Sequence, residues 1–226
     1  LSPFGMEMPV LEEIREVISE LKSAPNVSIS NSEIGVIFDY QAALNWKVQP
    51  HGKDNNYFDL VFDFYRCLRK LGQSIDFISP NNSNLNRYKV IIIPGAMHMD
   101  DQLICKLRKY SQTILLGPRS ACRDENLNLT EVTSFFPDFD LRIMASETFR
   151  ADSPVRLENG GFFVKYRELI VTQEKVLLKT ESGDPALIEC GKIKYLAGWP
   201  DESCLSKILK ELFKEENLSF KVMPER

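Results

Sequence analysis

The stretch KVIIIPGAMHMDDQLICKLRKYSQTILLGPRS, residues 89–120, decides the fold class. It opens with the apolar run Lys89–Ile93, which is typical of a buried strand and is closed by a Pro-Gly pair. Asp100 or Asp101 can cap a helix that runs to about Tyr110. A second apolar run, Thr113–Leu116, ends at a Gly-Pro pair. The order strand, helix, strand predicts a parallel βαβ unit.

The same alternation extends upstream. Residues 33–40 and 74–79 are further strand-like runs, and a helix is predicted between them over about 56–71, where Gly72 stops it. Residues 41–55 lack a clear period and are expected to form a long connection. Strands and helices that alternate in this way favour a mainly parallel sheet with helices on both faces.

Outside residues 33–117 the pattern differs. Apolar residues at helical spacing predict an N-terminal helix over about 11–21, followed by a polar linker over 25–33. Residues 140–198 read as added β-hairpins, and a final helix is predicted over about 201–216. The hairpin turns are expected at Asn159-Gly160, Ser182-Gly183-Asp184 and Cys190-Gly191.

Length and composition exclude several classes of protein. The 226 residues are fewer than the roughly 250 of a typical TIM barrel. A net charge of −4 gives no basic footprint for nucleic acid, and no apolar run is long enough to span a membrane. Five widely spaced cysteines and two histidines predict neither a disulfide framework nor a metal site, and reduced thiols fit a cytoplasmic protein. No nucleotide-binding motif is present, so no cofactor is expected.

Candidate chemistry gathers where the predicted strands end. Arg119, Ser120 and Cys122 follow the 113–116 strand, and His98 follows the 89–93 strand. The carboxyl ends of parallel strands are where ligands bind in such sheets. Ser120 or Cys122 could therefore be a nucleophile and Arg119 could hold an anion, but no base is visible beside them. The alternative is a structural Arg119, anchored on carbonyl or carboxylate oxygens.

The helix predicted over 56–71 is apolar on more than half of its circumference. A helix that covers one face of a sheet needs a single apolar stripe, so its second face must be covered by another part of the chain or by another chain. The interface candidates in this region are aromatic residues and one arginine, namely Trp46, Tyr57, Phe58, Phe62 and Arg66. Trp46 and Trp199 could alternatively stack on a sugar, as in a carbohydrate-binding module.

These residues resemble a known domain. The matching segments are Phe38-Asp-Tyr40, Trp46, Gln49-Pro50, Asp54, Tyr57–Val61, Phe64–Arg66, Leu68-Arg69 and Leu115–Ser120. Together they are similar to the trimerisation domain of family 42 glycoside hydrolases, the bacterial β-galactosidases. The resemblance is specific over 33–120 and is thinner from 140 to 218.

The resemblance implies a flavodoxin-like, class I glutamine-amidotransferase-like three-layer α/β sandwich without amidotransferase activity. Active relatives carry a cysteine at the elbow where this chain has Arg119, and a His-x-Glu where this chain has Trp199. The hydrolytic glutamates of family 42 enzymes lie in a barrel domain that this chain is too short to hold. This chain alone is therefore expected to be non-catalytic.

The chain is therefore expected to have three parts. Residues 1–32 are the helix and linker leaving a barrel, 33–220 are the trimerisation domain, and 221–226 are a tail. The expected function is homotrimeric assembly of a cytoplasmic β-galactosidase-like hydrolase of carbohydrate metabolism. Two alternatives remain open: a degenerate amidotransferase-like hydrolase that uses Ser120 or Cys122, and a carbohydrate-binding module.

Overall fold

The computed structural model describes residues 5–25, 31–82 and 84–223, which divide between Asn31 and Ser32 into two units. The first unit consists of helix α1 (Val10–Ser23), in agreement with the predicted helix. None of its residues is buried, and one face carries the apolar side chains of Val10, Ile14, Val17, Ile18 and Leu21. The predicted linker falls largely on residues outside those described.

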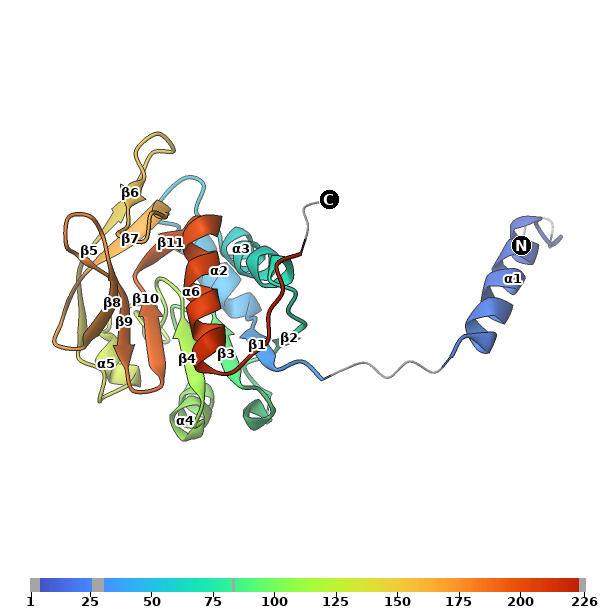
Figure 1. The fold of residues 1–226 in the computed structure, drawn as a ribbon, viewed down its shortest axis with the longest axis horizontal. Coiled ribbons are helices and arrows are strands. Elements are labelled where there is room, and N and C mark those ends of the chain that lie inside the picture. Colours follow the sequence, from blue (N-terminus) through green and yellow to red (C-terminus); the bar gives the residue numbers. More distant parts are fainter. Residues whose placement is uncertain (1–4, 26–30, 83, 224–226) are drawn as a thin grey trace. The chain divides into compact units, whose positions relative to one another are not determined.

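The second unit is built on a seven-stranded sheet in the order β2-β1-β3-β4-β10-β9-β8 (Figure 1). The neighbours from β2 to β10 are parallel, and β9 and β8 continue the sheet as antiparallel strands. The strands are β1 (Ile34–Ile37), β2 (Ile75–Ile78), β3 (Val90–Ile93), β4 (Thr113–Leu116), β8 (Lys175–Lys179), β9 (Pro185–Cys190) and β10 (Ile193–Leu196). This mainly parallel sheet with added antiparallel strands confirms the predicted mixed α/β class.

A smaller antiparallel sheet, β11-β7-β5, comes from the predicted hairpin region, and β6 pairs with β7. Its strands are β5 (Leu141–Thr148), β6 (Val155–Arg156), β7 (Phe162–Thr172) and β11 (Gly198–Pro200). Each of the three expected turns contains a glycine with positive φ, at Gly160, Gly183 and Gly191. Such a conformation strains any residue that has a side chain, which explains why glycine marks these turns.

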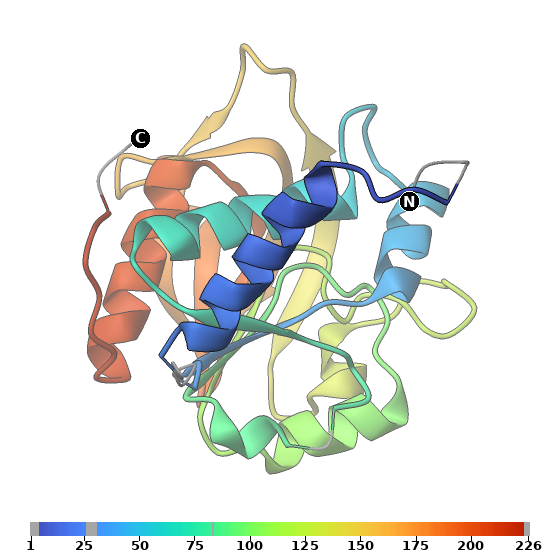
Figure 2. The same ribbon diagram turned by 90° about the vertical axis from the view of Figure 1, so that its right-hand side faces the viewer.

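Helices cover both faces of the main sheet. Helices α2 (Tyr40–Val48), α3 (Tyr57–Lys70) and α6 (Glu202–Glu215) lie on one face, and Figure 2 shows α3 and α6 side by side. The 3₁₀ helix η1 (Leu85–Arg87), α4 (Asp101–Lys109) and α5 (Val132–Phe135) lie on the other. Successive residues of β3 alternate between the two cores: Val90 and Ile92 face α3, whereas Ile91 and Ile93 face α4.

Side-chain caps begin four of these helices. The carboxylates of Asp39, Asp100 and Asp201 and the amide oxygen of Asn56 each accept a backbone N–H of the first turn. These caps fix the starts of α2, α4, α6 and α3, respectively, by satisfying N–H groups that have no partner within the helix.

The predicted long connection over 41–55 is wrong for its first half, which is helix α2. Ala42 and Trp46 of α2 are buried, yet Tyr40, Leu44 and Val48 on its opposite side are exposed and also apolar. Because both sides are apolar, the apolar residues of this segment do not form a single stripe, and its helical period is not evident in the sequence.

The last described residues hydrogen-bond to the end of α3. The backbone N–H groups of Lys221 and Met223 donate to the carbonyl oxygens of Leu71 and Lys70. The segment after α6 thus runs along the end of α3 as far as the described residues extend.

Candidate functional site

Strands β3 and β4 end close together, and the chain turns sharply after β4. A Cβ atom on Gly117 would lie 1.9 Å from the carbonyl oxygen of Pro94, so only glycine allows this approach. Two residues later Arg119 has a φ of +63°, a conformation that is uncommon for a residue with a side chain. Strained elbows of this kind cluster at functional positions, which makes this elbow the candidate site.

The Arg119 side chain is buried, with only 2% of the residue exposed. Its guanidinium donates to the carbonyl oxygens of Gln49 and Pro50, and it stacks 4.4 Å from the Trp46 ring centroid. Arg119 is thus anchored on carbonyl oxygens, as predicted for a structural arginine. These acceptors are neutral, so they do not cancel its positive charge.

Glu168 on β7 lies under the elbow and is fully buried. Its Oε1 accepts the backbone N–H of Arg119 at 3.0 Å and the hydroxyl of Tyr166 at 3.1 Å. Its Oε2 accepts the hydroxyl of Tyr195 at 2.8 Å. Burial raises the pKa of Glu168 to about 7, although these hydrogen bonds and the charge of Arg119 oppose the shift.

A cleft of about 470 Å³ opens beside the elbow. Its inner end is lined by Arg119, Arg123 and Tyr166, and its outer wall is the β5 segment Ile143–Ser146. His51 also lines it, with Nδ1 3.5 Å from the Ser146 hydroxyl. Burial and then the charges of the two arginines lower the pKa of His51, so the cleft has a positive potential.

The candidate nucleophiles are not activated. The Ser120 hydroxyl is buried and donates to the carbonyl of Ile93 at 3.4 Å. The Cys122 thiol donates to the carbonyl of Arg119, and burial raises its pKa to about 12. Neither group hydrogen-bonds to a histidine or carboxylate in the described part of the chain. This geometry argues against hydrolysis through Ser120 or Cys122, because a nucleophile needs a base or a lowered pKa.

His98 lies at the same edge of the sheet but does not join the Arg119 cluster. Its Nδ1 lies 3.3 Å from the carbonyl oxygen of Arg123, and its ring meets Phe135 edge-on. Of the three strand-end candidates, only Arg119 and Ser120 belong to the elbow itself.

The structure places two of the five interface candidates in the interior. Trp46 donates to the carbonyl oxygen of Gly95 at 2.7 Å, and the Tyr57 hydroxyl accepts the backbone N–H of Asp39. Both side chains are buried against the chain's own core, so neither can touch a partner. This corrects the prediction for Trp46 and Tyr57: a large aromatic residue in an amphipathic segment fills the core as readily as an interface.

Trp199 is also buried, and its indole N–H donates to Asp63 at 3.0 Å. It meets Trp46 edge-on with ring centroids 6.1 Å apart. Neither indole presents a face to solvent, so the alternative of sugar stacking on these two residues is wrong.

The other three interface candidates lie at the surface. Phe58 and Phe62 on α3 are 55% and 54% exposed, and Phe77 on β2 is exposed beside them. We call Phe58, Phe62 and Phe77 the aromatic patch; Tyr65 lies between Phe62 and Phe77, 6.1 and 5.9 Å from their ring centroids. Arg66 lies at its edge, where it pairs with Glu202 of α6 at 3.0 Å. Within the second unit this face of α3 therefore remains exposed.

Sequence reasoning missed Glu168, Tyr166, Tyr195 and Arg123. One signal was available: along β7, Tyr166, Glu168 and Ile170 are buried in alternation, so a glutamate stood at an inward position of a strand. Arg123 had no signal, because its proximity to Arg119 depends on a turn that the sequence does not specify.

The described residues contain no group of three or more His, Cys, Asp or Glu side chains placed to hold a metal ion. No helix in this part of the chain is long and apolar enough to cross a membrane.

Comparison with known proteins identifies the domain. The model of the β-galactosidase trimerisation domain matches residues 32–219. The chain is 29% identical over 222 residues to the β-galactosidase of Thermus thermophilus and 26% identical over 225 residues to that of a Thermus species. Each match covers 94% of this chain and 34% of the relative, so the chain spans about a third of these proteins.

Solved structures agree. The β-galactosidase of the psychrophilic Marinomonas ef1 superposes with a TM-score of 0.81 at 26% identity, over 95% of this chain and 34% of that one. The enzyme of the haloarchaeon Halorubrum lacusprofundi superposes with a TM-score of 0.82 at 20% identity, over 91% of this chain and 34% of that one. This match shows a likeness of fold. The matched region is an assembly domain, and the described residues contain no barrel. The chain therefore belongs to the β-galactosidase trimerisation domain family.

Proposed function

We propose that this chain assembles a β-galactosidase-like glycoside hydrolase into a homotrimer and takes no part in its chemistry. The family match supports assembly, and the aromatic patch is the observation that carries the interface. Monomeric proteins rarely leave neighbouring aromatic rings in solvent, whereas aromatic residues are enriched in interfaces. Phe58, Phe62 and Phe77 are each about half exposed in the isolated chain.

A cyclic trimer needs two different surfaces that meet around the threefold axis. Helix α2 offers the second surface. Tyr40, Leu44 and Val48 are exposed and lie on one side of it at a spacing of four residues. We propose that this α2 stripe of one copy packs on the aromatic patch of the next.

We also propose that the fold is flavodoxin-like and, more specifically, class I glutamine-amidotransferase-like. The five parallel strands follow the order β2-β1-β3-β4-β10, which is the flavodoxin-like order. The positive φ of Arg119 after β4 is the elbow geometry expected of a class I amidotransferase-like domain that has lost its cysteine. We also propose that residues 1–32 lead out of a barrel, that 33–220 form the trimerisation domain and that 221–226 are a tail. The five free thiols support a cytoplasmic location.

The test is the mass of the purified protein, measured by light scattering over a wide concentration range. We expect a trimer for the wild type and monomers for Phe62→Ser and for Val48→Ser. Val171→Ser, which removes an equally exposed apolar side chain from β7, is the matched control and should stay trimeric. A wild type that is monomeric at every concentration, or variants that remain trimeric, would contradict the proposed interface.

A further inference from the structure

The cleft beside the elbow is lined by two arginines whose guanidinium groups form no ion pair with a carboxylate in the described part of the chain. Arg123, 7% exposed, donates from Nε to the side-chain oxygen of Gln49 at 2.8 Å and from Nη1 to the carbonyl of Cys122 at 3.1 Å. Arg119 donates to the carbonyls of Gln49 and Pro50. In the described part of the chain, neither guanidinium forms an ion pair. Buried guanidinium groups normally have an anionic partner, because carbonyl dipoles do not cancel a full charge.

The carboxylates near the cleft are already engaged. Both carboxylate oxygens of Glu168 accept hydrogen bonds, from the backbone N–H of Arg119 and from the hydroxyls of Tyr166 and Tyr195. Glu131 lines the cleft on its open side and pairs with Arg142 at 3.4 Å. The inner end of the cleft thus keeps an excess of positive charge.

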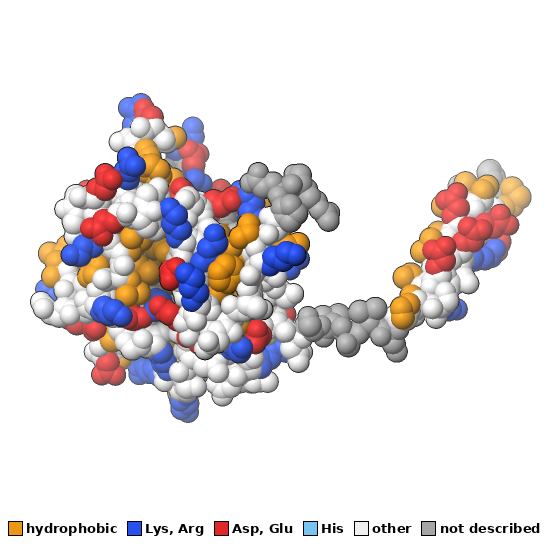
Figure 3. All heavy atoms as spheres, in the orientation of Figure 1, with side chains coloured by type: hydrophobic (Ala, Val, Ile, Leu, Met, Phe, Trp, Pro, Cys, Tyr) orange, Lys and Arg blue, Asp and Glu red, His pale blue; other side chains and the backbone are white. Residues whose placement is uncertain are grey.

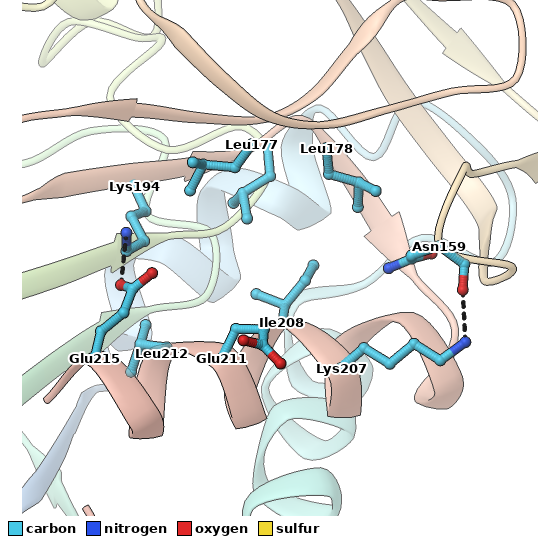
Figure 4. Close-up of a pocket in the computed structure, with 10 residues that line it drawn as sticks. Asn159, Leu177, Leu178, Lys194, Lys207, Ile208, Glu211, Leu212 and Glu215 are labelled. Atoms are coloured by element: carbon cyan, nitrogen blue, oxygen red, sulfur yellow. Dashed lines mark hydrogen bonds and ion pairs between the residues drawn. The ribbon is translucent and has the colours of Figure 1, made fainter. Parts of the chain in front are cut away.

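Another hollow of the unit, of about 440 Å³, provides a contrast. Apolar side chains gather between α6 and the β8–β9 strands, with charged groups around them (Figure 3). Figure 4 shows two polar contacts in it: Lys194 pairs with Glu215 at 2.9 Å, and Lys207 donates to the carbonyl oxygen of Asn159. Lys194 also pairs with Glu189. The buried Lys194 thus has carboxylate counter-ions, whereas neither guanidinium of the elbow cleft forms an ion pair in the described part of the chain.

We infer that the elbow cleft binds the carboxylate group of a small organic anion, with Arg123 as its principal ligand. A guanidinium presents paired N–H donors that match the two oxygens of a carboxylate. Arg119 adds charge from behind, and the ring of Tyr166 and the side chains of Ile143 and Met144 offer an apolar wall for the body of the ligand. A volume of about 470 Å³ is within the range of small-molecule sites. This inference does not depend on the trimer, because the aromatic patch and the α2 stripe lie outside the cleft.

The experiment uses two probes of one shape and different charge. Binding of 4-fluorobenzoate and of neutral 4-fluorobenzyl alcohol to the purified protein is followed by ¹⁹F NMR. We expect the wild type to bind the carboxylate and to show no measurable binding of the alcohol. Arg123→Gln should weaken carboxylate binding at least tenfold, whereas Arg150→Gln, an 85% exposed arginine paired with Asp152, should leave it unchanged.

A second pair of variants keeps the test valid even if Arg123→Gln does not fold. Met144 is 62% exposed on the outer wall, so its substitution leaves the core intact. Met144→Glu places a competing carboxylate in the cleft and should abolish binding, whereas Met144→Gln should retain it. Equal binding of both probes, retained binding by Arg123→Gln or Met144→Glu, or no carboxylate binding by the wild type would overturn the inference. Binding that appears only in the monomeric Phe62→Ser variant would overturn it too, because a neighbouring copy would then fill the cleft.

Discussion

The backbone N–H of Arg119 donates a hydrogen bond of 3.0 Å to the carboxylate of Glu168, 49 residues further along the chain. This bond joins the elbow after β4 to β7 of the smaller sheet, so a long-range contact holds the elbow in its strained conformation. The Arg119 side chain then extends to Gln49 and Pro50 after α2. Three segments that are distant in sequence are thereby fixed to one another.

Glu168→Gln should change how stability depends on pH. Burial raises the pKa of Glu168 from 4.5 to about 7 in the folded protein, so the folded state holds this proton more firmly than the unfolded state. The resulting stability is fully present below pH 4.5 and is lost as the pH rises through about 7, by at most about 3 kcal/mol. Glutamine does not titrate. Thermal unfolding from pH 4.5 to 8 should therefore show the wild type losing stability relative to Glu168→Gln, and a constant difference would contradict the buried carboxylate.

Arg119→Ala should lower the free energy of unfolding by about 2–4 kcal/mol, because the buried carbonyl oxygens of Gln49 and Pro50 lose their donor. Urea denaturation measures the change. Arg150→Ala, at an exposed arginine, is the control and should alter stability by less than about 0.5 kcal/mol. An Arg119→Ala variant as stable as the wild type would mean that this arginine has no structural role.

Gly117→Ala should prevent folding or destabilise the protein by more than about 4 kcal/mol, since the new Cβ would overlap the backbone carbonyl of Pro94. Gly183→Ala is the matched comparison: its Cβ meets nothing within 4 Å, and only its positive φ opposes the change. The comparison variant should lose about 1 kcal/mol. The yield of folded protein and thermal melts measure the stability of both variants. Equal losses of stability would show that the close approach of β3 and β4 is not required.

Alkylation should distinguish the thiols by burial. Burial raises the pKa of Cys67, Cys122 and Cys204 to about 12, so at pH 8 these thiols are protonated as well as inaccessible. Cys105 is exposed and should react first with iodoacetamide, as followed by mass spectrometry. All five should react in urea. Rapid modification of Cys122 in the folded protein would point to an activated nucleophile at the elbow and would reopen the hydrolase alternative.

Much of the fold follows from local pattern. Four short apolar runs and the helices between them predicted β2, β3, β4, α3 and α4 within a residue or two, because buried parallel strands are nearly continuous apolar segments. The run predicted for β1 extends three residues beyond its end at Ile37. The turn glycines at 160, 183 and 191 were evident for a local reason as well, since positive φ selects glycine wherever it occurs. The elbow residues Arg119 and Ser120 were found because they follow a strand directly.

The rest depended on contacts between distant segments. Helix α2 escaped detection because Trp46 on its buried side and Val48 on its exposed side are both apolar, so only the position of the sheet tells which side is inside. The same choice sends Trp46 into the core and leaves Phe62 in solvent, although both were equal candidates by residue type. Glu168 and Arg119 meet only after β7 has been placed beneath the end of β4. Local pattern in the sequence thus specifies most strands, helices and turns of this protein. Which aromatic side chains stay exposed and which charges share a cleft is decided by the tertiary structure, because both depend on neighbours that are remote along the chain.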